Sequence, residues 1–155
     1  MAQRCPRATL GGLSGEVSHN HSSREDHCRH QSSSATVRVR RVTDCLFCKI
    51  VARQIPADIV LETGRALAFR DVNPQAPTHV LVVPKAHHEN AAALAAADDG
   101  LADDLLTACH AVAVQEGVAE PGYRVVFNTG TGAGQTVFHV HAHVLGGRSL
   151  TWPPG

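Results

Sequence analysis

Residues 130–145 read GTGAGQTVFHVHAHVL, a glycine-rich loop followed at once by three histidines at alternate positions. From Val137 onward apolar and polar residues alternate, which predicts a strand buried on one face. The apolar residues that would point into a core are Phe138, Val140, Ala142 and Val144. The opposite face would carry His139, His141 and His143, and packing alone does not select three histidines there. We therefore interpret this strand as part of an active site.

Length and charge limit the class of protein. The chain has 155 residues, with 14 basic and 14 acidic side chains, and this length supports one compact domain. Residues 1–41 hold seven Arg and three acidic residues, whereas residues 42–155 hold seven Lys or Arg and eleven acidic ones. The acidic second part argues against a broad nucleic-acid surface. Apolar runs such as residues 80–83 are too short to span a bilayer, and no apolar signal segment follows the first arginines. We expect no nucleic-acid or membrane partner and no secretion.

The N-terminal part of the chain differs from the rest in composition. It is rich in Ser, Arg, His and Gly without any helical or strand period, so we expect a disordered extension over residues 1–43 and one domain over residues 44–155. Four histidines and two cysteines in the extension leave a metal-binding tail as an alternative, although they lack ligand spacing. The five cysteines of the chain are an odd number and include a Cys45-x-x-Cys48 pair. This pattern fits a reducing cytoplasm better than a disulfide framework.

Hydrophobic periodicity predicts two helices and five strands. Asp44 would cap a short N-terminal helix, Thr63-Gly64 would turn a hairpin, and Gly117 would end the one long helix. The expected helices cover residues 45–53 and 98–116, and the strands that precede the histidine strand cover residues 59–61, 66–69, 78–83 and 123–128. Strands joined by tight turns predict an α+β fold with a five-stranded antiparallel sheet. The segment after Gly146 would lie extended over the surface.

Spacing limits what the three histidines can do together. Alternate residues on a strand lie about 6.6 Å apart, so the outer two lie about 13 Å apart at the backbone. One metal ion bound by all three would strain a regular strand, because Zn–N distances are about 2 Å. Separate roles are favoured, with one imidazole as nucleophile and the others orienting it or moving protons. The glycine loop would offer backbone N–H groups as an anion-binding nest. Together they favour phosphoryl or nucleotidyl transfer through a phosphohistidine.

The segment His139-Val140-His141-Ala142-His143-Val144-Leu145 resembles the signature of the histidine triad (HIT) superfamily. Gly134-Gln135 before it and Gly146-Gly147-Arg148 after it resemble the Hint branch, whose members are nucleoside phosphoramidases that bind purine nucleotides. The similarity extends through residues 71–79 and 82–85 to the terminal Trp152-Pro153-Pro154-Gly155, so that it covers residues 44–155. The resemblance implies a HIT-like fold and a homodimer with a continuous sheet across its interface.

The resemblance also implies a role for each site residue. His141 would attack the α-phosphorus and carry the nucleotidyl intermediate, His143 would contact the phosphate, and His79 would join a hydrogen-bonded relay behind the nucleophile. Asp71 would accept the ribose hydroxyls. The positions near the phosphate and leaving group are Asn128, Gly134, Gln135 and Thr136, the last usually Ser in this branch. An apolar purine slot would consist of Phe47, Ile50, Ile55, Phe69 and Val72, with the terminal Trp152 as a further nucleotide contact; the alternative for the five slot residues is ordinary core.

Cys45 and Cys48 resemble half of a zinc site found in part of the superfamily. His87 and His139 would complete a closed Cys₂His₂ set, with His88 as a reserve ligand. The alternative is that the two cysteines are simply buried. We expect structural Zn²⁺ at this site and no metal in the chemistry itself.

The leading hypothesis is a cytoplasmic hydrolase that cleaves the P–N bond of purine nucleoside phosphoramidates, of the AMP or GMP type, through nucleotidyl-His141. One alternative is dinucleoside polyphosphate hydrolysis or nucleotidyl transfer, which a panel of substrates would separate. The other is a nucleotide-binding scaffold that does not depend on catalysis. The natural leaving group and the purine preference do not follow from the sequence.

Overall fold

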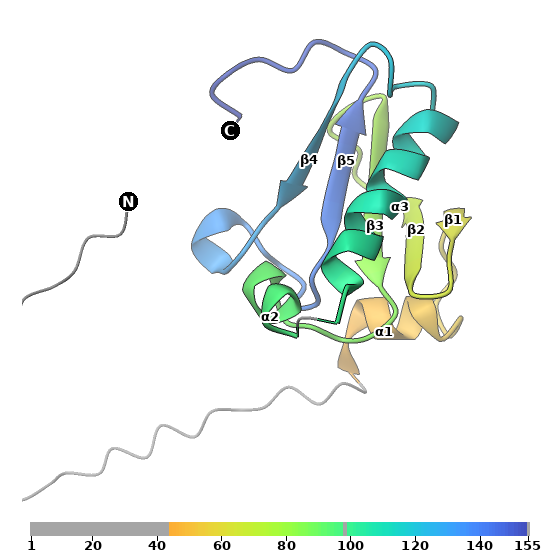
Figure 1. Ribbon diagram of the computed structural model, residues 1–155, viewed down its shortest axis with the longest axis vertical. Helices are drawn as coiled ribbons and strands as arrows, with labels where there is room; N and C mark the ends of the chain where they lie inside the picture. The colour runs from red at the N-terminus through yellow and green to blue at the C-terminus, as the bar shows by residue number, and fades with distance from the viewer. Residues whose placement is uncertain (1–43, 98, 155) are drawn as a thin grey trace, which may run out of the picture. The chain divides into compact units, whose positions relative to one another are not determined.

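The computed structural model describes residues 44–97 and 99–154 (Figure 1). The elements follow one another as α1 (Leu46–Val51), β1 (Ile59–Glu62), β2 (Ala66–Arg70), β3 (Thr78–Pro84), α2 (Ala91–Ala96), α3 (Leu101–Gln115), β4 (Tyr123–Phe127), the 3₁₀ turn η2 (Thr131–Ala133) and β5 (Ala142–Gly146). The predictions of a disordered extension and of a metal-binding tail fall on residues outside the described part.

The five strands form one sheet in the order β1-β2-β3-β5-β4, and every neighbouring pair is antiparallel. The α+β fold and the five-stranded antiparallel sheet expected from the sequence are therefore confirmed. β3 lies at the centre between β2 and β5, with Leu81 opposite His143 and His79 opposite Leu145. This register brings residues more than 60 positions apart in the chain onto the same patch of sheet.

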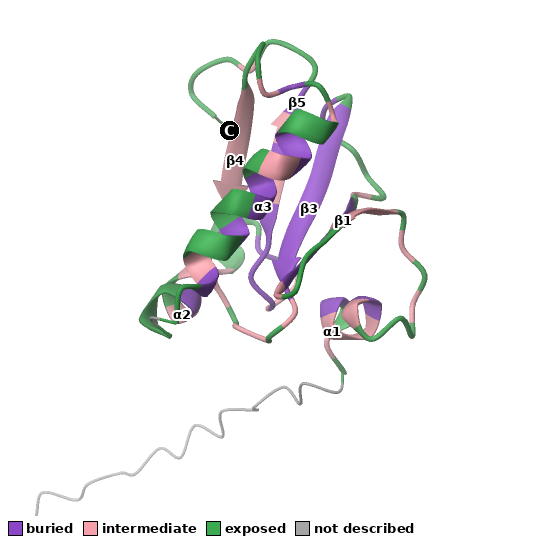
Figure 2. Cartoon of the chain, turned by 45° about the vertical axis from the view of Figure 1, so that its right-hand side comes forward, coloured by how far each residue is buried: buried purple, intermediate pink, exposed green. Residues whose placement is uncertain are grey.

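Strand alternation gives each face of the sheet its own core. The face under α2 and α3 holds a cluster that we call the helix-side core, whose strand members include Val80, Val82, Ala142 and Val144. The other face holds a smaller cluster, the site-side core, made of Phe47, Ile50, Leu67, Phe69, Leu81 and Val83. Figure 2 shows β3 buried along its length, next to α3. Among the helices of the described residues, only the short α1 contributes to the site-side core.

α3 covers the helix-side core with the face predicted for it. Leu101, Leu105, Ala108, Cys109 and Val112 are all buried, and Gly117 follows the helix with φ 70°. The helix begins at Leu101 rather than at residue 98, because Gly100 takes a left-handed φ of 78°. The side chain of Asp99 accepts a hydrogen bond from the Leu101 N–H at 3.0 Å, so it acts at the positive end of the helix as expected.

Two further boundaries were predicted wrongly, and one helix was not predicted. The fifth strand begins at Ala142 instead of Val137, because the Val140 N–H donates to the His88 carbonyl at 2.7 Å rather than to a ladder partner. α1 starts after Cys45, with no side-chain cap, rather than after Asp44. The helix α2 was not predicted, since six alanine and leucine residues carry little amphipathic pattern. The signal for it was Asn90, whose side chain accepts from the Ala93 N–H at 3.0 Å.

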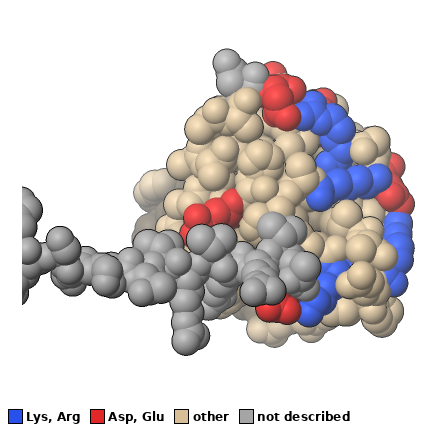
Figure 3. All heavy atoms as spheres, turned by 90° about the horizontal axis from the view of Figure 1, so that it is seen from below, with Lys and Arg blue, Asp and Glu red and all other residues tan. Residues whose placement is uncertain are grey.

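The basic side chains of the described residues are all bound to partners. Lys49, Arg53, Arg65, Arg70 and Lys85 form ion pairs with acidic residues. The remaining two, Arg124 and Arg148, donate to backbone carbonyls. On the face in Figure 3, blue and red side chains accordingly lie next to one another. The described part of the chain also has no helix long and apolar enough to cross a bilayer.

Candidate functional site

Two histidines from neighbouring strands meet on the site side of the sheet. His79 on β3 and His143 on β5 join through Nε2 and Nδ1 at 2.9 Å. The Gln75 N–H donates to His79 Nδ1 at 3.0 Å, so that nitrogen holds a lone pair and the proton of neutral His79 sits on Nε2. His79 therefore donates to His143. By the same reasoning, neutral His143 carries its own proton on Nε2.

The outer nitrogen of His143 has no partner. Nε2 is buried, and no described residue forms a hydrogen bond with it. Burial, followed by the charges of His141 and His79, lowers the pKa of His143 to about 4, so the ring is neutral at neutral pH. A buried N–H donor without an acceptor is costly. Such a group is what an oxygen of a bound ligand would satisfy.

His141 lies next to this pair with its tautomer fixed by the backbone. Its Nδ1 is 2.7 Å from the carbonyl oxygen of His139, which can only accept, so Nδ1 carries the proton. Nε2 is left with a lone pair and no partner among the described residues. The rings of His141 and His143 have centroids 5.0 Å apart. One face of the sheet thus presents a nucleophilic nitrogen beside a hydrogen-bond donor.

A cavity of about 460 Å³ opens beside the histidines, a volume in the range of small-molecule sites. All five residues predicted for an apolar slot line it, namely Phe47, Ile50, Ile55, Phe69 and Val72. The others that line it are Leu46, Pro56, Ala57, Asp58, Arg70, Asp71 and Leu81. Sequence analysis missed Leu81, although the strand alternation that includes His79 places it on the same face.

Asp71 connects this cavity to the histidine pair. It lines the cavity, and its Oδ2 lies 3.4 Å from Nε2 of His79. Its Oδ1 accepts the Asn73 N–H at 2.8 Å, which fixes the direction of the carboxylate. Asp71 is therefore a pre-oriented acceptor at the cavity wall.

The glycine-rich loop is held by its own hydrogen bonds. Gly130 and Gly134 have φ values of 81° and 82°, which glycine adopts without strain. The N–H groups of Gly130, Ala133, Gly134 and Gln135 all donate within the loop. These four N–H groups are therefore used within the loop, and anion binding at this loop stays a prediction.

The side chain of Gln135 braces the loop. It is 2% exposed, its Oε1 accepts from Gly130, and its Nε2 donates to the carbonyls of Glu89 and Val137. Asn128 follows β4, and Thr136 and Gly134 are exposed beside Gln135. Contacts of these four residues with phosphate or leaving group stay predictions.

Trp152 does not join the cavity within one chain. It is 84% exposed in the C-terminal segment, and it is not among the residues that line the cavity. Figure 1 shows the C-terminus beside β4, at the other end of the sheet from α1. Its contact with a nucleotide is a prediction that a single chain does not support.

The four residues expected to hold zinc come together. Cys45, Cys48, His87 and His139 offer ligand atoms that all lie within 4.8 Å of one another. Nδ1 of His139 lies 3.5 Å from Sγ of Cys45 and 3.4 Å from Sγ of Cys48. Nδ1 of His87 lies 3.3 Å from Sγ of Cys48 and 3.2 Å from Nδ1 of His139.

These separations fit a tetrahedral ion. With Zn–S bonds of about 2.3 Å and Zn–N bonds of about 2.0–2.1 Å, a sulfur and a nitrogen ligand lie about 3.6 Å apart and two nitrogens about 3.3 Å apart. His139 Nε2 donates to the Pro84 carbonyl at 2.9 Å, so Nδ1 keeps the lone pair that a metal needs. Burial lowers the pKa of His139 to about 4, which keeps this ring neutral. The donor set therefore fits Zn²⁺.

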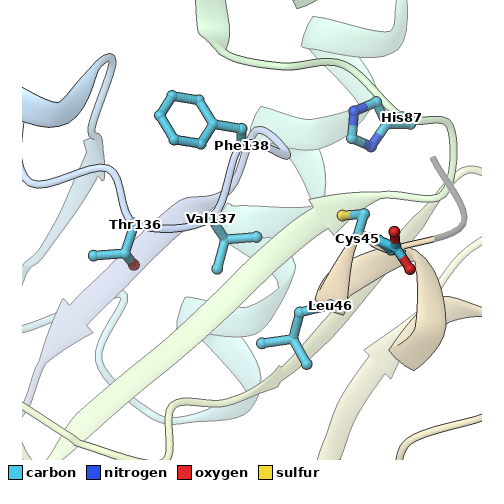
Figure 4. A pocket seen from close by; sticks show the side chains of 7 residues that line it. Cys45, Leu46, His87, Thr136, Val137 and Phe138 are labelled. Carbon is cyan, nitrogen blue, oxygen red and sulfur yellow. The ribbon is translucent and has the colours of Figure 1, made fainter. Parts of the chain in front are cut away.

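The triad does not act as one metal site. His139 belongs to the cysteine cluster, whereas His143 groups with Asp71 and His79. A second pocket, of about 400 Å³, lies against the cysteine cluster. Figure 4 shows Cys45 and His87 on one side of this pocket and Thr136, Val137 and Phe138 on the other. Phe138, which was expected in the core, lines this pocket instead.

Comparison with models of protein families matches residues 52–150 to the HIT domain. The chain belongs to the HIT family. An uncharacterised HIT-like protein of Synechococcus elongatus is 55% identical over 112 residues, covering 72% of this chain and 97% of that protein. A 14 kDa zinc-binding protein of Zea mays is 45% identical over 129 residues, 80% of this chain and 99% of that one. The purine nucleoside phosphoramidase of Escherichia coli K12 is 42% identical over 107 residues, 69% of this chain and 90% of the enzyme.

A solved structure agrees with this assignment. A HIT family hydrolase from Legionella pneumophila superposes with a TM-score of 0.69 at 49% identity, covering 72% of this chain and all of that one. The resemblance to the HIT family seen in the sequence is thus confirmed. In general terms the protein is a nucleotide-binding hydrolase with a HIT domain.

Proposed function

We propose that this HIT protein hydrolyses purine nucleoside phosphoramidates by cleaving their P–N bond through a nucleotidyl-His141 intermediate. The observation that carries the proposal is the free Nε2 lone pair of His141 beside the buried, unpartnered Nε2 of His143. The similarity to a purine nucleoside phosphoramidase of Escherichia coli supports the choice of substrate.

In the first step, Nε2 of His141 attacks the α-phosphorus. The new P–N bond to His141 forms as the bond to the leaving amine breaks, and the amine takes up one proton from solvent. Because Nδ1 keeps its proton, the modified ring becomes a cation. The His139 carbonyl, 2.7 Å away, stabilises that cation by a charge-assisted hydrogen bond.

In the second step, water attacks the phosphorus and His141 departs as neutral imidazole, which releases the nucleoside monophosphate and returns one proton to solvent. Nε2–H of His143 donates to a phosphate oxygen in both steps, where negative charge develops. His79 holds His143 in the tautomer that makes this possible. The purine would lie in the apolar cavity, and Asp71 would accept the ribose hydroxyls.

We further propose a cytoplasmic homodimer. β4 is an edge strand that pairs only with β5 among the described strands, and all its residues are half-buried. An edge of this kind favours pairing with another strand. A second copy of β4 would extend the sheet across the interface. Sedimentation of the purified protein at micromolar concentration tests this oligomeric state.

Structural Zn²⁺ completes the proposal. Cys45, Cys48, His87 and His139 would hold it, and the name of the maize relative supports the choice of metal. The ion would tie α1 to the segment before β5 and would have no part in the chemistry.

The proposal is tested by trapping the intermediate. The protein is mixed with an adenosine or guanosine phosphoramidate, denatured in alkali, in which phosphohistidine survives, and analysed by mass spectrometry. We expect a nucleotidyl adduct on the wild type and on His110→Ala, a control on the exposed side of α3, but none on His141→Ala. Equal hydrolysis by His141→Ala would overturn the mechanism. Turnover confined to dinucleoside polyphosphates, or tight binding without turnover, would favour one of the two alternatives.

A further inference from the structure

We propose that the Cys₂His₂ metal site and the nucleotide cavity are energetically coupled, so that bound Zn²⁺ tightens nucleotide binding and bound nucleotide tightens the hold on Zn²⁺. The inference rests on the proposed function for the identity of the cavity's ligand. It goes beyond that function by giving the metal site a regulatory consequence.

The short helix α1 serves both sites at once. Cys45, before its first turn, and Cys48 within it supply the two sulfur ligands. Phe47 and Ile50, from the same turns, line the cavity and are the helix's buried residues. Since ligand and cavity residues alternate along six residues, a shift of the helix changes both sites.

Phe47 connects the two sites directly. Its ring makes a T-shaped contact with the ring of His139, with centroids 6.0 Å apart. It makes a second T-shaped contact with the ring of His141, with centroids 5.1 Å apart. It also packs against Phe69 across the cavity wall, with centroids 5.5 Å apart. The side chain flanked by the two cysteine positions therefore touches a metal ligand, the proposed nucleophile and the wall of the slot.

A backbone path runs beside this ring contact. Two hydrogen bonds hold the segment before β5 against the end of β3 and the segment that follows it. His139 Nε2 donates to the carbonyl of Pro84, the last residue of β3, and the Val140 N–H donates to the His88 carbonyl. The carbonyl of His139 in turn fixes Nδ1 of His141 at 2.7 Å. An ion bound at His87 and His139 would pin this path at both ends.

α1 depends on its tertiary contacts to stay in place, among them Cys45 and Val51, which pack against the site-side core. Its N-terminus has no side-chain cap, and a six-residue helix is not stable by itself in water. Two buried side chains anchor it to the site-side core. Without the metal, nucleotide binding has to order α1, which forms one wall of the cavity, and the entropy lost in that ordering weakens binding. With the metal bound, α1 is already ordered before the nucleotide binds.

Coupling of this kind is reciprocal. We expect nucleoside monophosphate to bind about tenfold more tightly to the zinc-loaded protein than to the chelator-treated protein. Saturating nucleotide should then slow the loss of zinc to a chelator by up to the same factor. It should also lower the apparent zinc dissociation constant by that factor.

The experiment has two arms on the full chain. Calorimetry measures the affinity for AMP and GMP with and without zinc, and chelator competition measures the zinc affinity with and without AMP or GMP. The second arm starts from zinc-loaded protein, so it does not depend on a stable metal-free form. Lys49→Ala, a change in α1 that keeps every ligand and every cavity residue, is the matched control for Cys48→Ser.

Each result has a distinct meaning. The coupling is supported if zinc changes the nucleotide affinity by the same factor by which nucleotide changes the zinc affinity. This factor should be preserved in Lys49→Ala and lost in Cys48→Ser. Nucleotide affinity that is the same with and without zinc overturns the coupling and leaves the proposed function intact. Failure of both forms to bind any nucleotide overturns the coupling together with the proposed function.

Discussion

The carbonyl oxygen of His139 accepts the Nδ1–H of His141 at 2.7 Å, so a backbone group of one triad histidine selects the reactive nitrogen of the next. His139 is itself held by the Pro84 carbonyl at Nε2, which turns Nδ1 toward the cysteines. His79 is held by the Gln75 N–H. In each of these rings one backbone partner determines which nitrogen is left for function.

Replacing Asp71 should weaken binding of ribonucleotides. Loss of an acceptor for the ribose hydroxyls costs about 1–2 kcal/mol, so Asp71→Ala should raise KM for an adenosine phosphoramidate about tenfold. The 2′,3′-dideoxy analogue lacks the hydroxyls and provides the control. If its KM rises equally in the variant, Asp71 acts on the His79–His143 pair rather than on the ribose.

His79→Asn should lower kcat more than it raises KM. The substitution removes the 2.9 Å hydrogen bond to His143, so the Nε2–H tautomer of His143 is no longer enforced. We expect a fall in kcat of about ten- to a hundredfold, in the range of a lost proton-positioning group. Nitrogen-15 chemical shifts of His143 report the tautomer directly. An unchanged tautomer in the variant contradicts this role.

Acid should destabilise the fold through His143. The unfolded chain binds a proton on this residue below its ordinary pKa of 6.5, whereas the folded chain does so only near 4. The stabilisation is therefore complete above pH 6.5 and lost progressively as the pH falls toward 4. Urea unfolding measures the free energy of unfolding at pH 7 and at pH 5. Between these two pH values, the drop in this free energy should be about 1–2 kcal/mol smaller for His143→Gln than for the wild type. Equal losses would assign the acid sensitivity to other groups.

Zinc affinity should rise with pH. Burial, followed by the neighbouring Cys45, raises the pKa of Cys48 to about 11, so its thiol is protonated in the metal-free protein and must release a proton on binding. His139, with a pKa of about 4, contributes no proton above pH 6. We expect at least a tenfold gain in affinity from pH 6.5 to 7.5, measured by chelator competition with the chelator's own protonation taken into account. A pH-independent affinity would contradict thiolate ligation.

Neighbouring leucines on α3 should respond very differently to truncation. Leu105 is 0% exposed in the helix-side core, and Leu105→Ala should cost about 2–5 kcal/mol of unfolding free energy. Leu106 is 53% exposed, and Leu106→Ala should change that free energy by less than about 0.5 kcal/mol. Chemical denaturation of both variants measures the difference. Similar losses would mean that the outer face of α3 is covered in the native assembly.

The sequence predicted those features that a local pattern or a motif determines. Periodicity identified four strands and the long helix, because the apolar side chains of α3 recur on one face. The resemblance to the HIT family brought Cys45, Cys48, His87 and His139 together correctly, which spacing alone could not do across 94 positions. Hydrogen bonds between distant backbone groups were not predictable. The start of β5 depends on such a bond, from the Val140 N–H to the His88 carbonyl. The glycine loop is held by short-range bonds and by the side chain of Gln135, which the composition of the loop does not reveal.

Adjacent residues of β3 lie on opposite faces of the sheet. Val80 and Val82 lie in the helix-side core, whereas His79 and Leu81 face the site. Leu81 also belongs to the site-side core, together with Val83, so this strand packs a core on each of its faces. Substitutions at Val80 or Val82 should change the stability and leave the site face untouched. Substitutions at Leu81 should change the stability and the cavity wall together. A designer who alters the ligand through this strand therefore has to restore the lost packing elsewhere.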